Sequence, residues 1–167
     1  MNETYVELLV KRKKSMLMAL LKTLTTMLAV CFGIFGFGFM NLPALLITVV
    51  MGVAAYFISM NAEIEYEYLY VDKELTVDKI MAKSKRKRVA TYDMTKIEIL
   101  APERSHRLDS YRNNTRYKMK DFTSGVVGQP DIRYTFYYEG AEKVMFEPNE
   151  EMVKAIMMAA PRKVFRD

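Results

Sequence analysis

A long stretch without charge constrains this chain more than any other feature. Residues 23–62 contain no Asp, Glu, Lys or Arg and include the segment TMLAVCFGIFGFGFMNLPALLITVVMGVAAYFISM. As a single α-helix, this stretch would be about 60 Å long, roughly twice the hydrocarbon thickness of a bilayer. The chain must therefore turn back within it. A soluble domain made from only 167 residues could not bury so long an apolar run, so we expect a membrane protein.

The turn is expected in the segment GFGFMNLP. Its glycines weaken a helix, Asn41 can cap a new helix, and Pro43 is tolerated only in a first turn. These signals predict one helix over residues 15–39 and another over residues 43–61, each long enough to span a membrane. A signal peptide is too short to explain the run. A single span with a re-entrant loop would leave backbone polar groups unpaired in lipid.

Basic residues predict the orientation of this hairpin. The sequence KRKK at residues 11–14 directly precedes the first helix, Lys22 lies within reach of the same interface, and the connection between the helices carries no charge. The positive-inside rule then places both chain ends in the cytoplasm. We expect a multi-pass protein of the cytoplasmic (inner) membrane with a cytoplasmic basic segment at 1–14, a transmembrane helical hairpin at 15–62 and a cytoplasmic domain at 63–167.

Small residues recur every four positions in both predicted helices. Stripes of this kind let two helix backbones approach closely in lipid. We expect a contact within the hairpin, and an oligomer interface, including a homo-oligomer, is the alternative. The residues concerned are Thr25, Ala29 and Gly33 in the first helix and Ala44, Thr48 and Gly52 in the second. Ionisable residues, the usual mark of ion pathways, do not occur at residues 23–62, so we do not expect a transporter or channel working alone.

After residue 62 the pattern changes to the alternation typical of β-strands. In EIEYEYLYV, the residues Ile64, Tyr66, Tyr68 and Tyr70 share one face. Six further short strands are predicted near residues 75–77, 87–92, 97–99, 115–121, 132–138 and 144–146. The segment EPNEEMVKAIMMAAPRK then has a helical period. Seven antiparallel strands followed by an amphipathic helix predict an α+β domain, a small barrel or sandwich closed by the helix.

This order of elements resembles a pleckstrin-homology (PH)-like fold of the bacterial membrane-attached kind, in which a two-span hairpin leads into the sheet. The resemblance rests on EYEYLYVDKELTVDKI, YDMTKIEIL and YTFYYEGAEKVMFEPNEEMVKAI. The chain also looks like a family of small two-span membrane proteins from Gram-positive bacteria, similar in KDFTSG and FEPNEEM. These motifs are structural and imply fold and location. Eukaryotic PH domains bind headgroups through a basic first hairpin loop; here that turn is DKE, so the family's site is not carried over.

Residue types that support catalysis or metal binding are scarce. The chain has one His, one Cys and no Trp. His106 lies near Ser105 and Asp109, but three residues of one loop rarely reach triad geometry, because each partner must be held by a separate rigid element. The acids of the first predicted strand are too far apart to converge on one cation without other ligands, and a solvated face is favoured. We therefore expect no enzyme, no catalytic residue, no metal ion and no cofactor.

The tyrosines of the first predicted strand could stack nucleic-acid bases. Their neighbours are Glu, whereas single-strand binders surround such rings with a basic groove. Ordinary sheet packing is therefore favoured, and we expect no nucleic acid as a partner.

Concentrated positive charge occurs in the segment KSKRKR. It could be a solvated turn. Because the hairpin would hold it near an anionic leaflet, it could also contact anionic lipid headgroups or an acidic protein. The residues are Lys83, Lys85, Arg86, Lys87 and Arg88. Two functions remain open: a non-enzymatic membrane-anchored interaction module that docks a protein partner or anionic lipid, and an accessory subunit of a larger membrane complex that contacts it through the hairpin.

Overall fold

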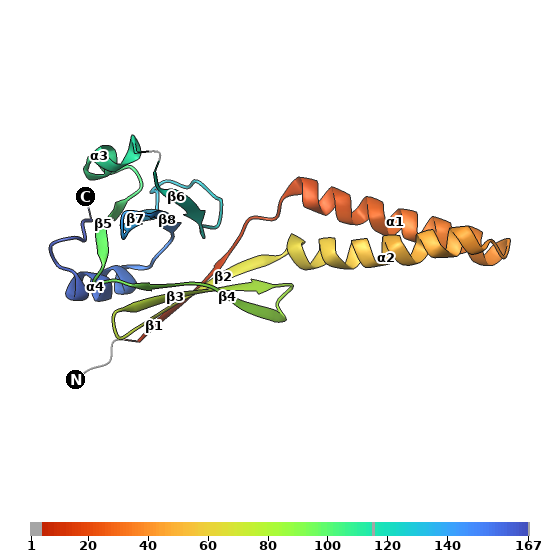
Figure 1. Cartoon of the computed structure of the whole chain (residues 1–167), viewed down its shortest axis with the longest axis horizontal. Helices are drawn as coiled ribbons and strands as arrows, with labels where there is room; N and C mark the ends of the chain where they lie inside the picture. Colours follow the sequence, from red (N-terminus) through yellow and green to blue (C-terminus); the bar gives the residue numbers. More distant parts are fainter. Residues whose placement is uncertain (1–4, 115, 167) are drawn as a thin grey trace. The chain divides into compact units, whose positions relative to one another are not determined.

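The computed structural model describes residues 5–114 and 116–166 of the chain (Figure 1). They form two compact units. One unit, the sheet domain, takes in the chain up to Arg12, Glu65–Lys79 and the chain from Arg86 onward. The other, the hairpin unit, comprises Lys13–Ile64 and Ile80–Lys85.

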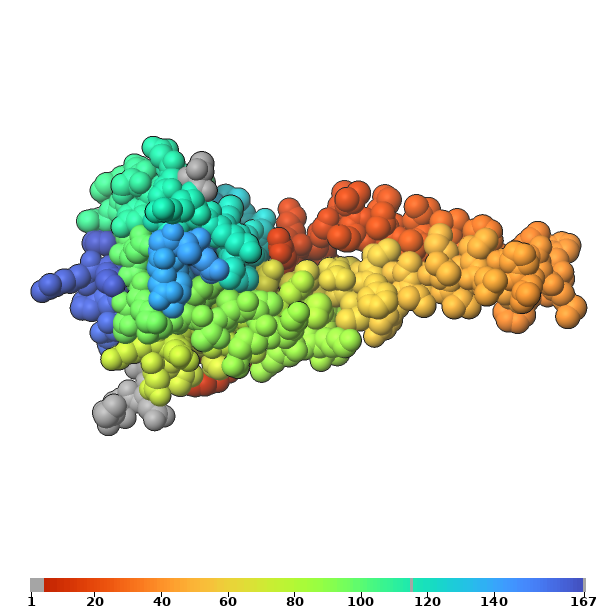
Figure 2. All heavy atoms as spheres, viewed as in Figure 1, coloured from red at the N-terminus to blue at the C-terminus, as the bar shows by residue number. Residues whose placement is uncertain are grey.

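The hairpin unit contains α1 (Met16–Gly38) and α2 (Leu42–Ala62), close to the predicted bounds. Asn41 caps α2 by accepting a hydrogen bond from the backbone N–H of Ala44 at 3.2 Å, and Pro43 lies in the first turn, where it breaks no helical hydrogen bond. The two helices pack against each other (Figure 2). Most of their large apolar side chains are exposed. Both are long and apolar enough to cross a membrane.

Within residues 5–114 and 116–166, eight strands form two four-stranded sheets. The first sheet has the order β1 (Val6–Lys11), β2 (Ile64–Val71), β3 (Glu74–Met81), β4 (Lys85–Asp93). The second has the order β5 (Ile97–Pro102), β7 (Tyr134–Tyr138), β8 (Glu142–Phe146), β6 (Lys118–Asp121). A 3₁₀ turn η1 (His106–Leu108) and a short helix α3 (Asp109–Arg112) connect β5 to β6, and helix α4 (Glu150–Ala159) follows β8.

The prediction of seven strands is wrong by one, because β1 lies within residues 1–14, for which the sequence predicts no strand. Val6, Leu8 and Val10 of β1 lie opposite Tyr70, Tyr68 and Tyr66 of β2, the face expected from the sequence. The prediction that every pair is antiparallel is also wrong, since β6 and β8 run parallel. The strand expected at 115–121 is found at Lys118–Asp121, and residue 115 lies outside the described residues.

Helix α4 packs on the core of the sheet domain. The helix is found where the sequence predicts it. Asn149 caps this helix through a hydrogen bond from the Met152 N–H at 2.8 Å. Ile156 is fully buried, whereas Lys154 on the other face is exposed. The Tyr70 hydroxyl donates to the Ala155 carbonyl at 3.2 Å, which ties the helix to β2. The apolar face of α4 thus has the partner that its periodicity required.

Candidate membrane-contact site

Three lysines act on the charge of one carboxylate, Glu63, at the end of the hairpin unit where α2 stops. Lys14 Nζ donates to Glu63 Oε1 at 2.6 Å, and the Ala82 N–H donates to the Glu63 carbonyl at 2.9 Å. The second bond holds the turn at residues 82–84 against the end of α2. The Lys14 ammonium lowers the pKa of Glu63, and the charges of Lys83 and Lys22 lower it further. We call Lys14, Lys22 and Lys83 the lysine collar.

The collar is confined to one end of the hairpin. Lys14 pairs with Glu63 there, and the charges of Lys22 and Lys83 also act on that carboxylate, whereas residues 39–41, which join the two helices at the other end, carry no charge. This asymmetry matches the charge distribution that orients membrane helices.

The basic segment proves to be mostly strand, and its arginines differ from its lysines. Successive side chains of β4 point to opposite faces. Arg86 Nη2 lies 2.5 Å from Glu67 Oε1 on β2, and Arg88 Nε lies 3.5 Å from Asp78 Oδ1 on β3. Both carboxylates are buried. The two arginines therefore serve as counter-ions for acids inside the sheet domain.

The pKa of Glu67 reflects both its burial and its pairing with Arg86. Burial raises its pKa, and the nearby carboxylates of Glu7 and Asp78 raise it as well, while the guanidinium of Arg86 opposes them. A buried carboxylate that loses its cation is strongly penalised. Arg86 is thus part of what makes the first sheet stable.

The lysines of the basic segment are placed differently. Lys83, Lys85 and Lys87 are exposed, and none of their side chains forms a hydrogen bond or ion pair with another described residue. The structure therefore divides the five residues that the sequence treated as one cluster. Only the three lysines have free ammonium groups, and contact with lipid or a partner remains a prediction for them.

The small residues of the hairpin lie partly where the sequence placed them. A Cβ atom on Gly33 would lie 3.4 Å from Thr48 Cγ2, so these two residues face each other. The tightest approach is at Gly36, which the stripe omitted: a Cβ atom there would lie 2.8 Å from Leu45 Cδ2. Gly52 is exposed, with open space around it.

Helix geometry explains why Gly52 lies outside the contact between α1 and α2. A row of residues spaced by four drifts around a helix that has 3.6 residues per turn. The half-buried positions of α2 accordingly continue at Met51 and Ala55. The other residues of the stripes are half-buried or buried: Thr25, Ala29 and Ala44.

The Ser, His and Asp of one loop are used for local structure. Ser105 Oγ accepts a hydrogen bond from the Arg107 N–H at 3.3 Å, and Asp109 pairs with Arg112 at 2.8 Å. His106 is exposed. Within residues 5–114 and 116–166, no group of three or more His, Cys, Asp or Glu is arranged to hold a metal ion.

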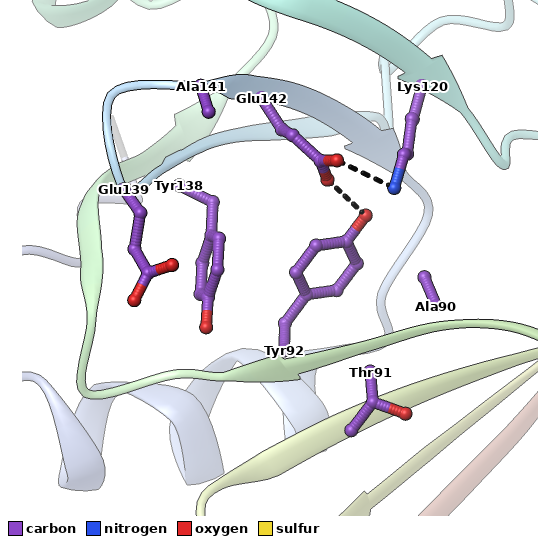
Figure 3. A pocket seen from close by; sticks show the side chains of 8 residues that line it. All are labelled: Ala90, Thr91, Tyr92, Lys120, Tyr138, Glu139, Ala141 and Glu142. Atoms are coloured by element: carbon purple, nitrogen blue, oxygen red, sulfur yellow. Dashed lines mark hydrogen bonds and ion pairs between the residues drawn. The ribbon is translucent and has the colours of Figure 1, made fainter.

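A pocket of about 240 Å³ lies between β4 and the β7–β8 turn (Figure 3). Glu142 accepts a hydrogen bond from the Tyr92 hydroxyl at 3.0 Å and forms an ion pair with Lys120 Nζ at 2.8 Å. Burial raises the pKa of Tyr92. Glu139 at the rim pairs with Lys96 at 3.5 Å. Both carboxylates of this pocket thus have a cation already. No pattern in the sequence indicates this pocket, since its walls come from separate segments.

The KDFTSG and FEPNEEM stretches meet in the sheet domain. Ser124 donates to Glu147 Oε1 from its backbone N–H at 3.1 Å and from its hydroxyl at 2.8 Å. The Tyr68 hydroxyl donates to the Phe122 carbonyl at 2.6 Å. Glu147 is buried, so these bonds satisfy a carboxylate that would otherwise be costly. Their shared role is structural.

Two sheets with a C-terminal helix, and an apolar helical hairpin inserted between the first two strands, define a PH-like domain protein with two helices that can cross a membrane. The family model of DUF6106, described as a bacterial PH-like domain, matches residues 2–166, so the chain belongs to this family. Comparison with curated proteins and with solved structures finds no match. The family match confirms the resemblance and suggests a module without catalytic activity.

Proposed function

We propose that this protein is a non-enzymatic interaction module, anchored in the cytoplasmic membrane by α1 and α2, whose lysine collar docks anionic lipid headgroups at the inner face. The observation that carries the proposal is the confinement of Lys14, Lys22 and Lys83 to one end of the hairpin. Lys14 is partly neutralised by Glu63. Each unpaired lysine held near an anionic leaflet contributes about 1 kcal/mol of attraction, which decays within a Debye length. Lys85 and Lys87, exposed and unpaired, add to this charge.

Strand pairing supports the topology that the proposal needs. β1 precedes α1 and β2 follows α2, yet Lys11 lies opposite Glu65 in one sheet. This pairing supports a topology in which both ends of the hairpin are on the same side of the membrane. The positive-inside rule assigns that side to the cytoplasm.

Lipid selectivity of the full-length protein tests the docking step. In reconstituted vesicles, spin-labelled phosphatidylglycerol should associate with the protein more strongly than spin-labelled phosphatidylcholine, and the preference should fall at high salt. Replacing the three collar lysines with Gln should remove most of the preference. A matched control replaces three exposed basic residues elsewhere: Lys73, Lys154 and Arg162. If the control loses as much preference as the collar variant, the docking site is not the collar.

Reporter fusions test the orientation separately. A cytoplasmic reporter fused after the last residue should be active, and one inserted at residues 39–41 should be inactive. An external C-terminus would overturn the assignment to the inner face.

A further inference from the structure

Residues 124–130, with the sequence SGVVGQP, form an uncharged loop between β6 and β7 that we call the tip loop. Val126 is 49% exposed and Val127 is 60% exposed. Gly125, with φ +74°, makes the turn before them. Two adjacent apolar side chains thus project from the sheet domain into their surroundings.

Hydrogen bonds fix the stem of the tip loop next to β6. The Thr123 N–H and hydroxyl both donate to Asp121 Oδ1, at 2.9 and 2.7 Å, and Ser124 is held by buried Glu147. The Val126 N–H then donates to Ser124 Oγ at 3.1 Å. These contacts hold the backbone that leads to the valines in place.

Ion pairs of Asp131 fix the stem of the tip loop next to β7. Arg133 donates to Asp131 from Nε at 2.8 Å and from Nη2 at 2.7 Å, and Arg104 lies 3.2 Å from the same carboxylate. The Arg133 guanidinium lowers the pKa of Asp131 to about 2, so the pair is charged at any physiological pH. With both stems fixed, the valines are presented outward by the fold.

We propose that the tip loop inserts Val126 and Val127 into the interface of the same membrane that α1 and α2 cross. A bilayer fits the patch better than a protein does, because stable protein interfaces bury more than about 1,000 Å² and centre on Trp, Tyr or Arg anchors. Two valines supply neither. A tethered domain needs little intrinsic affinity, because the tether provides a high effective concentration.

Chain connectivity keeps the sheet domain within reach of the lipid. Arg12 donates to the Tyr66 hydroxyl at 3.0 Å inside the sheet domain, and α1 begins at Met16. The residues between them span at most about 14 Å when fully extended. On the other side, α2 ends at Ala62 and β2 begins at Ile64. The inference rests on the proposed function in that the hairpin must cross the membrane.

Because the sequence contains no Trp, the fluorescence of a single introduced Trp can be measured without background from other Trp residues. Val127→Trp places a single Trp at the tip loop of the full-length protein, and Met158→Trp places one at another exposed apolar position, 79% exposed on α4. Both variants are reconstituted into vesicles that contain lipids brominated near the headgroup end of the acyl chains. We expect blue-shifted emission from V127W and several-fold stronger quenching than from M158W.

Three results would overturn the proposal. V127W quenched no more than M158W, or equally accessible to aqueous iodide, means that the tip loop stays in water. Blue-shifted V127W emission without quenching by brominated lipid means that a protein surface covers the valines. The double variant Val126→Ser, Val127→Ser tests the contact without a bulky probe: if vesicles slow protease cleavage at the tip loop, relative to detergent, no more in the unsubstituted protein than in the double variant, insertion is contradicted.

The same vesicles separate this proposal from the proposed function. Quenching of V127W without any preference for anionic lipid would reject headgroup docking by the lysine collar and leave insertion of the tip loop supported. Preference for anionic lipid without quenching would reject insertion alone.

Discussion

In the basic segment, Arg86 pairs with buried Glu67, whereas Lys87 has no partner among the described residues. We therefore expect Arg86→Gln to destabilise the protein and Lys87→Gln to leave its stability unchanged. The two substitutions are adjacent on β4, remove the same charge and affect exposed side chains. They differ in one respect: Arg86 neutralises buried Glu67, and Lys87 has no partner among the described residues.

The structure sets the size of the effect. Breaking a fully buried ion pair costs about 3–5 kcal/mol, whereas an exposed pair is worth about 0–1 kcal/mol. The Glu67 side chain is 9% exposed, but that of Arg86 is 59% exposed, so water screens the pair. We expect Arg86→Gln to lower the free energy of unfolding by about 1–2 kcal/mol at neutral pH, and Lys87→Gln to change it by less than about 0.5 kcal/mol.

The penalty should depend on pH with a definite sign. Burial holds the pKa of Glu67 above its unfolded value, and removing Arg86 raises this pKa further. A carboxyl with a raised folded-state pKa contributes stability below its unfolded pKa and loses it as pH rises through the folded pKa. The cost of Arg86→Gln should therefore be largest at neutral pH and shrink toward about pH 4.3, where an ordinary Glu takes up its proton.

Pulse proteolysis in urea on the full-length protein in mild detergent measures these differences. Glu67→Gln provides the thermodynamic cycle: in that background Arg86→Gln should cost little, because the buried charge is gone. Equal destabilisation by Arg86→Gln and Lys87→Gln, or a cost of Arg86→Gln that is the same in the Glu67→Gln background, would refute the assignment of Arg86 as a counter-ion.

Two further predictions concern the sheet domain. Ile156→Ala should lower the free energy of unfolding by about 2–4 kcal/mol because it empties a fully buried position, and Lys154→Ala on the exposed face should cost far less; the reverse order in urea unfolding would contradict the packing of α4. A fragment of residues 63–167 lacks β1, so it should be less stable than a chain in which an Asn-Gly turn replaces residues 12–64; equal urea midpoints would mean that β1 contributes nothing.

Local signals explain why much of the fold could be predicted. The charge-free run, Asn41 and Pro43 each act within a few residues, and they located both helices and the turn. The alternation after residue 62 and the helical period of α4 are local as well. For such elements, the residues that determine the structure are neighbours in the sequence.

The elements that were mispredicted depend on distant partners. β1 has period-two signals in Val6, Leu8 and Val10, but Leu9 interrupts the alternation, and its partner β2 lies beyond the whole hairpin. The parallel pairing of β6 with β8 places β6 at an edge of the second sheet, which the chain reaches through a long connection. No residue within β6 indicates this pairing. Tertiary contacts decide both cases.

The candidate site shows the same limit. A run of basic residues is visible in the sequence. Separating its paired arginines from its unpaired lysines requires knowing that Glu67 and Asp78 are buried beside Arg86 and Arg88. The position of Lys83 at the end of α2 likewise follows from a backbone hydrogen bond between distant residues. Charge composition predicts that a surface attracts anions, and only the fold shows which cations are free to do so.

The place of β1 in the chain ties completion of the sheet domain to placement of the hairpin. β1 is synthesised before α1, and β2 after α2, so the first sheet can close only when both helices leave their outer ends on one side of the membrane. Pairing then covers Val6, which is buried opposite Tyr70. If only one helix crossed, β1 and β2 would lie on opposite sides and the eight-stranded domain could not form. A complete sheet domain therefore requires that the helices cross together or not at all, and their exposed apolar surfaces favour crossing.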